Sequence, residues 1–405
     1  PETACMYFDH LKHKYNRPNE YEFDAKVVEV FANLLDGNKK NIAILDQSYF
    51  YPTSGGQQHD LGSLKIRGVE YNITNLEKVG KCVLHILDKE IPEDCIGETV
   101  QGIVDERRRV QLRNHHTSAH IIFAAARQVL GPHVWQQGAK KTDQQAHLDV
   151  THYSSLTKDE ELAIQSAANR IVMKAINIKK TLETKSDAEK LHGFSLYQGG
   201  IVPGNELRVV EIEGVDVEAC CGTHCDNTAE VGWIKVINTK RIADGIVRLY
   251  FVAGERTLEK LNEESKVINE LSALWSVPQD EIVSNANKIF KNFKRKSSDL
   301  DEAKKKILNL QVKYVLDRKD IKGGVIKSDE PNSTPYFSFL NNYAVELRDA
   351  DKSIVFYNDQ FIFGFFPTLT SINVEDVKSK IGKDVEVKIM NLFGPKGKQV
   401  KDCVV

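Results

Sequence analysis

The hydrophobic pattern changes its period at Asp105, and this change limits what the chain can fold into. Before Asp105, short stretches alternate apolar with polar residues and end in Gly, Asn or Asp turns, a pattern typical of β-strands. After Asp105, apolar residues recur at helical spacing as far as Leu130, and Gly131 follows as a natural helix end. We therefore predict a small β-barrel domain over residues 1–105 and a long helix directly behind it.

The rest of the chain predicts an α+β multidomain protein. A second helix with an acidic start, followed by strands, indicates a two-layer α/β domain over residues 106–254. Residues 255–318 are polar and strongly helical, which indicates a helical hairpin or short coiled coil. Residues 319–405 predict a small terminal α/β domain. Its expected strands are "AVELRDA", "SIVFYND", "QFIFGFF" and "DVEVKIMNLF", with a helix near "NVEDVKSKIG".

Composition excludes several classes of protein. The 405 residues are 41% hydrophobic and 28% charged with a net charge of -2, which argues against disorder and leaves any RNA contact to local patches. No apolar run approaches the ~18 residues that span a bilayer, and no secretory leader is present, so we expect a cytoplasmic protein without membrane or DNA partners. The chain begins at Pro1 rather than Met, which favours a trimmed protein or the back part of a longer one.

The cysteines and histidines predict a metal site. Seven cysteines, three of them within six residues, form a poor disulfide framework and indicate metal binding in a reducing compartment. Two pairs of residues, each four apart, supply three imidazoles and one thiolate, a complete tetrahedral set for Zn²⁺. Alone, the histidine pair is better explained by surface or core packing, and the Cys220 and His224 pair is explained equally well by a structural role. Cys221 and Cys225 remain alternative thiolates. The candidate ligands are His116, His120, Cys220 and His224.

These two motifs resemble a known pair. "NHHTSAH" with "CCGTH" is similar to the HxxxH and CxxxH motifs of the editing domain in the alanyl-tRNA synthetase family. The family's Cys-Gly-Gly-Thr-His has Cys221 here in place of its first glycine. The resemblance is strongest over residues 22–256 and looks like the archaeal-type branch. It includes "FYPTSGGQQHDLG", "VLGPHVWQQG", "LDVTHY", "GGIVPGNELRVVEI", "CDNTAEVGWIKV" and "RIADGIVRLYFVAGE".

The resemblance implies roles for individual residues. It makes the four candidates zinc ligands, Gly55 and Gly56 a loop against the substrate pocket, and Gln136 a pocket residue. Thr117 and Thr223 adjoin ligands and are candidate substrate contacts. Each has an open alternative: turn glycines, an amide paired with backbone, and threonines bonded to backbone. Three further residues are expected outside the site: His115 points about 100° away from its neighbouring ligand, and Trp135 and Trp233 are expected to be buried rather than stacked on RNA.

The function implied by the resemblance is zinc-dependent hydrolysis of Ser-tRNA(Ala) and Gly-tRNA(Ala). Zinc can activate water or polarise a carbonyl, but four protein ligands would equally suit an ion that positions the substrate. One alternative is the editing and tRNA-binding half of an alanine–tRNA ligase, acting with a separate aminoacylation half. Another is a non-catalytic RNA-binding scaffold with a structural zinc. Because no segment resembles a synthetic core, we do not expect the chain alone to make Ala-tRNA.

The back part of the chain predicts association. Apolar residues recur at helical spacing in the segment 255–318, which indicates a homodimer through these helices or, alternatively, packing on their own chain. The lysine-rich stretches "KNFKRK" and "AKKKILNLQVK" fit either phosphate contacts or a solvated face. The family's terminal glycine-rich motif reads "FGPKGKQVKDC", so we expect only modest tRNA affinity there. The apolar positions are Leu258, Leu261, Val267, Leu271 and Leu274.

Overall fold

The computed structural model describes most of the chain and separates it into two compact units, residues 1–270 and 271–405. The residues described are 2–7, 20–35, 39–198, 200, 202, 204–320, 323–327, 339, 342–357, 362–365, 387–389 and 403–404. None of the helices in these ranges is long and apolar enough to cross a membrane. The predicted α+β class is confirmed, and the division into four domains stays a proposal.

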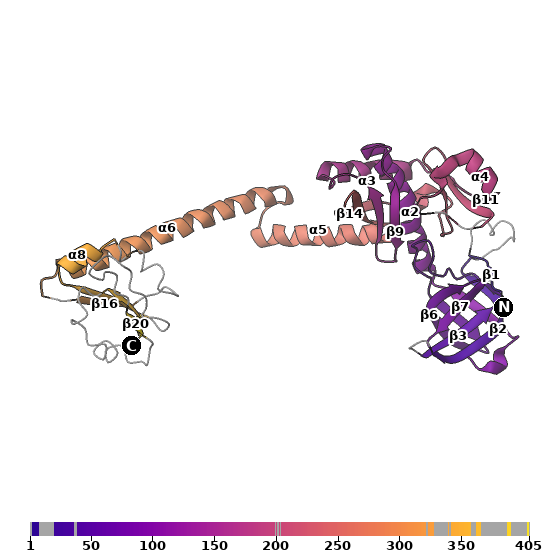
Figure 1. The fold of residues 1–405 in the computed structure, drawn as a ribbon, viewed down its shortest axis with the longest axis horizontal. Coiled ribbons are helices and arrows are strands. Elements are labelled where there is room, and N and C mark those ends of the chain that lie inside the picture. The colour runs from indigo at the N-terminus through magenta and orange to yellow at the C-terminus, as the bar shows by residue number, and fades with distance from the viewer. Residues whose placement is uncertain are drawn as a thin grey trace. The chain divides into compact units, whose positions relative to one another are not determined.

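A closed barrel forms the N-terminal part of the first unit, as the alternating pattern predicts (Figure 1). Alternate residues of its strands, such as Phe23, Ala25 and Val27, point inward and are buried. A short parallel pair, β1 (Ala4–Cys5) with β4 (Gln47–Ser48), lies beside it. In barrel order the strands are β2 (Glu22–Leu35), β3 (Lys39–Leu45), β7 (Cys82–Leu87), β6 (Val69–Val79), β5 (Gly62–Ile66) and β8 (Thr99–Val104).

One histidine is enclosed in the barrel away from the candidate metal ligands. His85 is fully buried, with Nδ1 at 3.1 Å from the carbonyl oxygen of Ala43 and Nε2 at 2.8 Å from the hydroxyl of Ser48. Because a carbonyl only accepts, Nδ1 carries the proton and Nε2 accepts from the hydroxyl. Burial lowers the pKa of His85 to about 4, so the ring is neutral in the folded protein.

We expect His85 to destabilise the protein in acid. Between pH 6.5 and 4 the unfolded chain binds a proton at His85 that the folded chain cannot bind, so stability falls as pH falls, by about 1.4 kcal/mol per pH unit. The variant His85→Gln should lose this part of the pH dependence of stability, while the parts that come from the other buried histidines remain. Urea unfolding from pH 7.5 to 4.5 checks this, and identical pH slopes for wild type and variant would contradict it.

The second part of this unit begins with the predicted long helix, α2 (Glu106–Leu130). The side chain of Asp105 caps it by accepting from the backbone N–H of Arg108, and Gly131 ends it with φ of 117°. Helix α3 (Lys158–Met173) starts with a capping box between Thr157 and Glu160. Both helices pack on an antiparallel sheet through a core that includes Ile121, Ile122, Leu148, Leu249 and Phe251. The sheet order is β14 (Ile234–Ala243), β15 (Ile246–Ala253), β10 (Ala146–Thr151) and β9 (Gln136–Lys141).

A smaller antiparallel sheet completes the region that holds the candidate site. Its strands are β11 (Ile178–Thr184), β12 (Glu206–Ile212) and β13 (Asp216–Ala219). Helix α4 (Lys185–His192) and the 3-10 helix η2 (Gly193–Leu196) follow β11, and another short 3-10 helix, η3, spans Thr228–Val231. Strand β13 leads directly into Cys220, so the sheet fixes where the second motif enters the site.

Two long helices follow, as predicted: α5 (Glu255–Trp275) and, after η4 (Gln279–Glu281), α6 (Ile282–Asp317). Four of the five apolar positions singled out in α5 are well exposed: Leu258 60%, Leu261 42%, Val267 56% and Leu274 74%. An exposed apolar face at helical spacing is compatible with self-association. Dimerisation through this segment stays a prediction.

In the second unit, one of the expected strands is wrong. "AVELRDA" forms the helix α8 (Ala344–Asp349), because its buried residues Ala344 and Leu347 are three apart and most of its residues favour helices. The expected helix near "NVEDVKSKIG" and residues 393–402 of the glycine motif lie outside the described residues. The sheet runs in the order β16 (Gly323–Lys327), β17 (Ser353–Tyr357), β18 (Ile362–Phe365), β19 (Val387–Ile389) and β20 (Cys403–Val404).

Candidate metal centre

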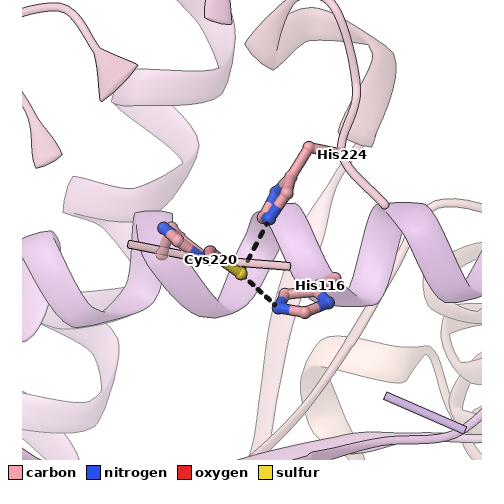
Figure 2. A group of neighbouring side chains, drawn as sticks. His116, Cys220 and His224 are labelled. Atoms are coloured by element: carbon pink, nitrogen blue, oxygen red, sulfur yellow. Dashed lines mark hydrogen bonds between the residues drawn. The ribbon is translucent and has the colours of Figure 1, made fainter. Parts of the chain in front are cut away.

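The four candidate ligands lie together, although they come from distant parts of the chain; Figure 2 shows three of them, His116, Cys220 and His224. Two of them are on α2 and two on the loop after β13, and their ligand atoms all lie within 4.8 Å of one another. Sγ of Cys220 is 3.3 Å from Nε2 of His116 and 3.3 Å from Nε2 of His224. The ring centroid of His120 is 4.6 Å from that of His224.

This donor set fits a zinc ion. Zinc–nitrogen bonds of about 2.1 Å and zinc–sulfur bonds of about 2.3 Å place tetrahedral ligand atoms about 3.3–3.8 Å apart. The two sulfur–nitrogen distances of 3.3 Å lie in this range. Gly222 makes the arrangement possible, because a Cβ there would lie 1.9 Å from Cε1 of His116. His116, His120, Cys220 and His224 would therefore hold the ion.

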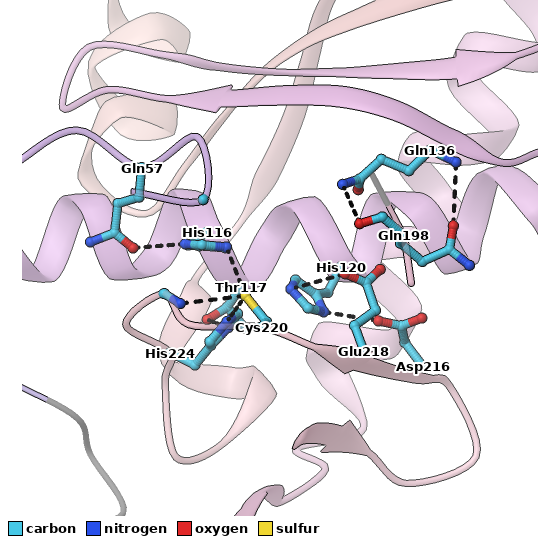
Figure 3. Close-up of polar contacts among 12 residues, drawn as sticks. Gln57, His116, Thr117, His120, Gln136, Gln198, Asp216, Glu218, Cys220 and His224 are labelled. Atoms are coloured by element: carbon cyan, nitrogen blue, oxygen red, sulfur yellow. Dashed lines mark hydrogen bonds and ion pairs between the residues drawn. The ribbon is translucent and has the colours of Figure 1, made fainter. Parts of the chain in front are cut away.

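Each imidazole keeps Nε2 for a ligand role because Nδ1 has another partner (Figure 3). Nδ1 of His116 lies 2.7 Å from Oε1 of Gln57, and Nδ1 of His120 lies 2.9 Å from Oδ2 of Asp216. Nδ1 of His224 lies 3.3 Å from the hydroxyl of Thr117. Such partners fix the tautomer and orientation of histidines that bind metals.

Electrostatics favour a thiolate among neutral and charged imidazoles. Burial alone raises the pKa of Cys220, but His116 and His224 outweigh it and hold that pKa well below its ordinary value. Burial lowers the pKa of His116 to about 4. Burial also lowers the pKa of His120, but the nearby carboxylates of Glu218 and Asp216 outweigh it and raise that pKa. A dication would offset the negative charge collected here.

Glu218 is a site residue that the sequence did not predict. Its Oε2 lies 3.5 Å from Nε2 of His120, and its Oε1 is buried without a hydrogen-bond partner. Burial raises the pKa of this carboxyl well above its ordinary value. In the sequence, only its position two residues before Cys220 could have indicated a place near the site.

Gln57 is the second site residue that the sequence did not predict, and the glycine loop positions it. Gly56 has φ of 73°, and a Cβ there would lie 2.2 Å from the carbonyl oxygen of Ala139, so the loop approaches β9 closely. Gln57 is fully buried; its Oε1 accepts from the backbone N–H of Thr223 at 3.1 Å, and its Nε2 donates to the Thr223 hydroxyl at 3.0 Å. The two loop glycines thus position a partner of both ligand motifs.

We expect Gln57→Ala to weaken zinc binding by about 10- to 100-fold, as for other partners of metal-bound histidines. The variant removes the acceptor that holds the proton on Nδ1 of His116. The neighbouring Gln58→Ala is the matched control, because Oε1 of Gln58 has no hydrogen-bond partner. Competition with a chromophoric chelator measures the affinity. Equal zinc affinity in the two variants would contradict a role for Gln57.

The three neighbouring thiols have different environments. Cys225 is fully buried with Sγ 3.3 Å from Oδ1 of Asn114, and burial raises its pKa to about 11. Cys221 lies outside the four-ligand group, and burial raises its pKa as well. Among the alternatives that spacing leaves open, the geometry favours Cys220. His115, as expected, is turned away, with Nδ1 2.6 Å from the carbonyl oxygen of Thr142.

The predicted substrate contacts are mostly engaged inside the protein. Thr117 is buried, and its hydroxyl accepts from the backbone N–H of Cys225 at 3.1 Å, beside its contact with His224. Gln136 donates from Nε2 to the backbone oxygen of Gln198 at 3.4 Å, which is the backbone pairing of the alternative interpretation (Figure 3). Their roles toward a substrate stay predictions.

One tryptophan prediction is wrong. Trp233 is 61% exposed rather than buried, because its neighbour Ile234 takes the buried position and successive side chains point to opposite sides. Trp135 is partly exposed, with the guanidinium of Arg127 5.7 Å from its ring centroid.

Comparison with known proteins assigns the chain to a class. Residues 207–250 match the threonyl and alanyl tRNA synthetase second additional domain, and residues 5–108 match class II (A) tRNA synthetases. The second match covers the barrel, where the sequence alone showed no likeness to a synthetic core. The chain is thus related to aminoacyl-tRNA synthetases.

The similar curated proteins narrow the class to one family. Alanine–tRNA ligase of Methanobrevibacter smithii is 35% identical over 88% of this chain, and that of Thermococcus kodakarensis is 38% identical over 88%. Alanine–tRNA ligase of Methanopyrus kandleri is 37% identical over 77% of this chain. The chain belongs to the alanyl-tRNA synthetase family, and it spans 33–38% of the length of these relatives.

Proposed function

We propose that this chain hydrolyses the ester that joins serine or glycine to the 3′ end of tRNA(Ala), with one bound Zn²⁺. The observation that carries the proposal is the convergence of His116, His120, Cys220 and His224, with an Nδ1 partner for each histidine. The family match over residues 207–250 supports the assignment to editing rather than to synthesis. We place this activity in the cytoplasm.

The residues of this chain prepare the site before a substrate arrives. Gln57, Asp216 and Thr117 hold the three imidazole rings in place, which lowers the reorganisation needed during the reaction. When bound, zinc supplies either an activated water or a polarised carbonyl. Oε1 of Glu218 lies buried beside the site without a hydrogen-bond partner inside the protein.

Selectivity requires a group that recognises the serine hydroxyl, which alanine lacks. A site that hydrogen-bonds a substrate hydroxyl discriminates strongly against the analogue without it. Thr223 and Thr117 adjoin ligands in the sequence, and their hydroxyls lie 3.3 Å from Oε1 of Gln57 and 3.3 Å from Nδ1 of His224, respectively. We retain them, together with Gln136, as candidate substrate contacts.

A second candidate is a part of an alanine–tRNA ligase that works with an aminoacylation half. The chain spans only 33–38% of the relatives named alanine–tRNA ligase, which favours this candidate. The signature of the third interpretation, a scaffold with structural zinc, would be missing ligands, and none of the four ligands is missing here.

A reconstitution experiment tests the proposal against these candidates. Ser-tRNA(Ala) is incubated with the full chain, alone and together with the aminoacylation half of an archaeal relative. We expect hydrolysis by the chain alone. Hydrolysis only in the presence of the added half would favour the ligase part, and none under either condition would favour the scaffold.

A further inference from the structure

The antiparallel sheet behind the metal centre presents a second face to solvent. Helices α2 and α3 pack on the face that carries Leu148, Leu249 and Phe251. Because successive side chains of a strand alternate between faces, the neighbours of these residues point the other way. This opposite face carries Lys140 on β9, His147 on β10, Arg248 and Tyr250 on β15, and Asn238 and Lys240 on β14.

Strand register places these side chains in two rows. In the first row Lys140 pairs with His147, His147 with Tyr250, and Tyr250 with Asn238. In the second row Arg248 lies between Asp149 and Lys240. We call these residues the outer sheet face. A bulge at Asp149 and Val150 turns Gln136 away from this face and leaves Lys140 on it.

The outer sheet face combines aromatic rings with positive charge. The rings of His147 and Tyr250 are 5.6 Å apart, and the guanidinium of Arg248 lies 5.9 Å from the Tyr250 ring centroid. Tyr250 is partly exposed, while Lys140 and Lys240 are exposed.

Charge is not balanced across the two rows. Asp149 is bound by Arg248 at 2.6 Å, so it does not neutralise the lysines. Among the described residues, Lys140 and Lys240 take part in no ion pair. A chain with a net charge of -2 therefore concentrates two free cations and two rings on one sheet surface.

We propose that the outer sheet face binds RNA, with Tyr250 stacking on a base and Lys140 and Lys240 contacting phosphates. This deepens the proposed function by naming the surface that would hold the tRNA while its 3′ end reaches the metal centre. Two neighbouring rings with lysines beside them suit single-stranded or frayed nucleotides, whose bases expose their flat faces. A protein partner would favour a more apolar surface with fewer unpaired lysines.

The test compares two charge-reversal pairs in the full chain. Lys140→Glu/Lys240→Glu alters the outer sheet face. Lys158→Glu/Lys190→Glu makes the same charge change at 78% and 75% exposed lysines on α3 and α4. We expect the first pair of substitutions to lower the affinity for a tRNA(Ala) transcript at least about tenfold, and to reduce the slope of log affinity against log salt by about one to two. The control pair should change neither the affinity nor this slope appreciably. Tyr250→Leu should cost about tenfold and Tyr250→Phe little.

Two readouts separate this proposal from the proposed function. Fluorescence anisotropy reports tRNA affinity, and hydrolysis of a serine ester of adenosine reports the site without the RNA body. We expect the sheet variants to hydrolyse the small ester at the wild-type rate. Equal loss of tRNA affinity in both charge-reversal pairs, or no loss in either, overturns the RNA surface. If the wild type hydrolyses no ester, the proposed function fails, and the affinities still decide on the surface.

Discussion

Cys220→Ala should abolish zinc binding by the purified chain. The variant removes the only thiolate of the four-ligand group and leaves three imidazoles, one of which has its pKa raised by Glu218 and Asp216. Removing a ligand weakens zinc binding more than removing the hydrogen-bond partner of a ligand. We therefore expect the zinc affinity to fall by more than about 100-fold. Zinc content by elemental analysis after dialysis measures the effect, with wild type at about one ion per chain.

The neighbouring thiols supply matched controls. Cys225→Ala should keep its zinc, because the Cys225 thiol contacts Asn114 rather than the ligand group. Cys221→Ala should keep its zinc as well. Full zinc in Cys220→Ala, or in a His116→Ala/His120→Ala double variant, would show that the metal binds elsewhere.

Gly222→Ala should disrupt the metal centre by sterics alone. Its Cβ would lie 1.9 Å from Cε1 and 2.1 Å from Nδ1 of His116, so the ring must leave its position between Cys220 and Gln57. Backbone strain is not involved, because Gly222 does not have a positive φ. We expect loss of zinc at a cost of about 1–3 kcal/mol in stability, typical of overpacking.

Gly138→Ala is the control for this substitution. It also lacks a positive φ, and its Cβ would lie 3.4 Å from Oδ2 of Asp149, an ordinary contact. Zinc content and far-ultraviolet circular dichroism of both variants give the answer. A Gly222→Ala protein that binds zinc like Gly138→Ala would contradict the placement of His116.

The sequence predicts the parts of this molecule that depend on local pattern. Alternation indicated the barrel strands, helical spacing indicated α2, and the i, i+4 pairs indicated which residues could share a metal. Where the pattern was ambiguous the prediction failed. "AVELRDA" satisfies both periods over its short length, and only the packing of Ala344 and Leu347 selects the helix.

The residues around the ligands could not be predicted from the sequence, because their partners are distant along the chain. Gln57 looks like Gln58 in sequence, and only the fold shows that one is buried against His116. Asp216 and Glu218 are ordinary acidic residues of a strand until β13 brings them to His120. The exposure of Trp233 likewise depends on the fold, which buries its neighbour Ile234 instead.

Deacylation of Ser-tRNA(Ala) and Ala-tRNA(Ala) by the zinc-loaded chain tests the central claim most directly. Initial rates are measured for both esters, with Cys220→Ala as the blank. We expect rapid release of serine by the wild type, release of alanine at least about tenfold slower, and no release above the uncatalysed rate by Cys220→Ala. Equal rates for the two esters, or equal rates for wild type and Cys220→Ala, would contradict a zinc-dependent editing activity.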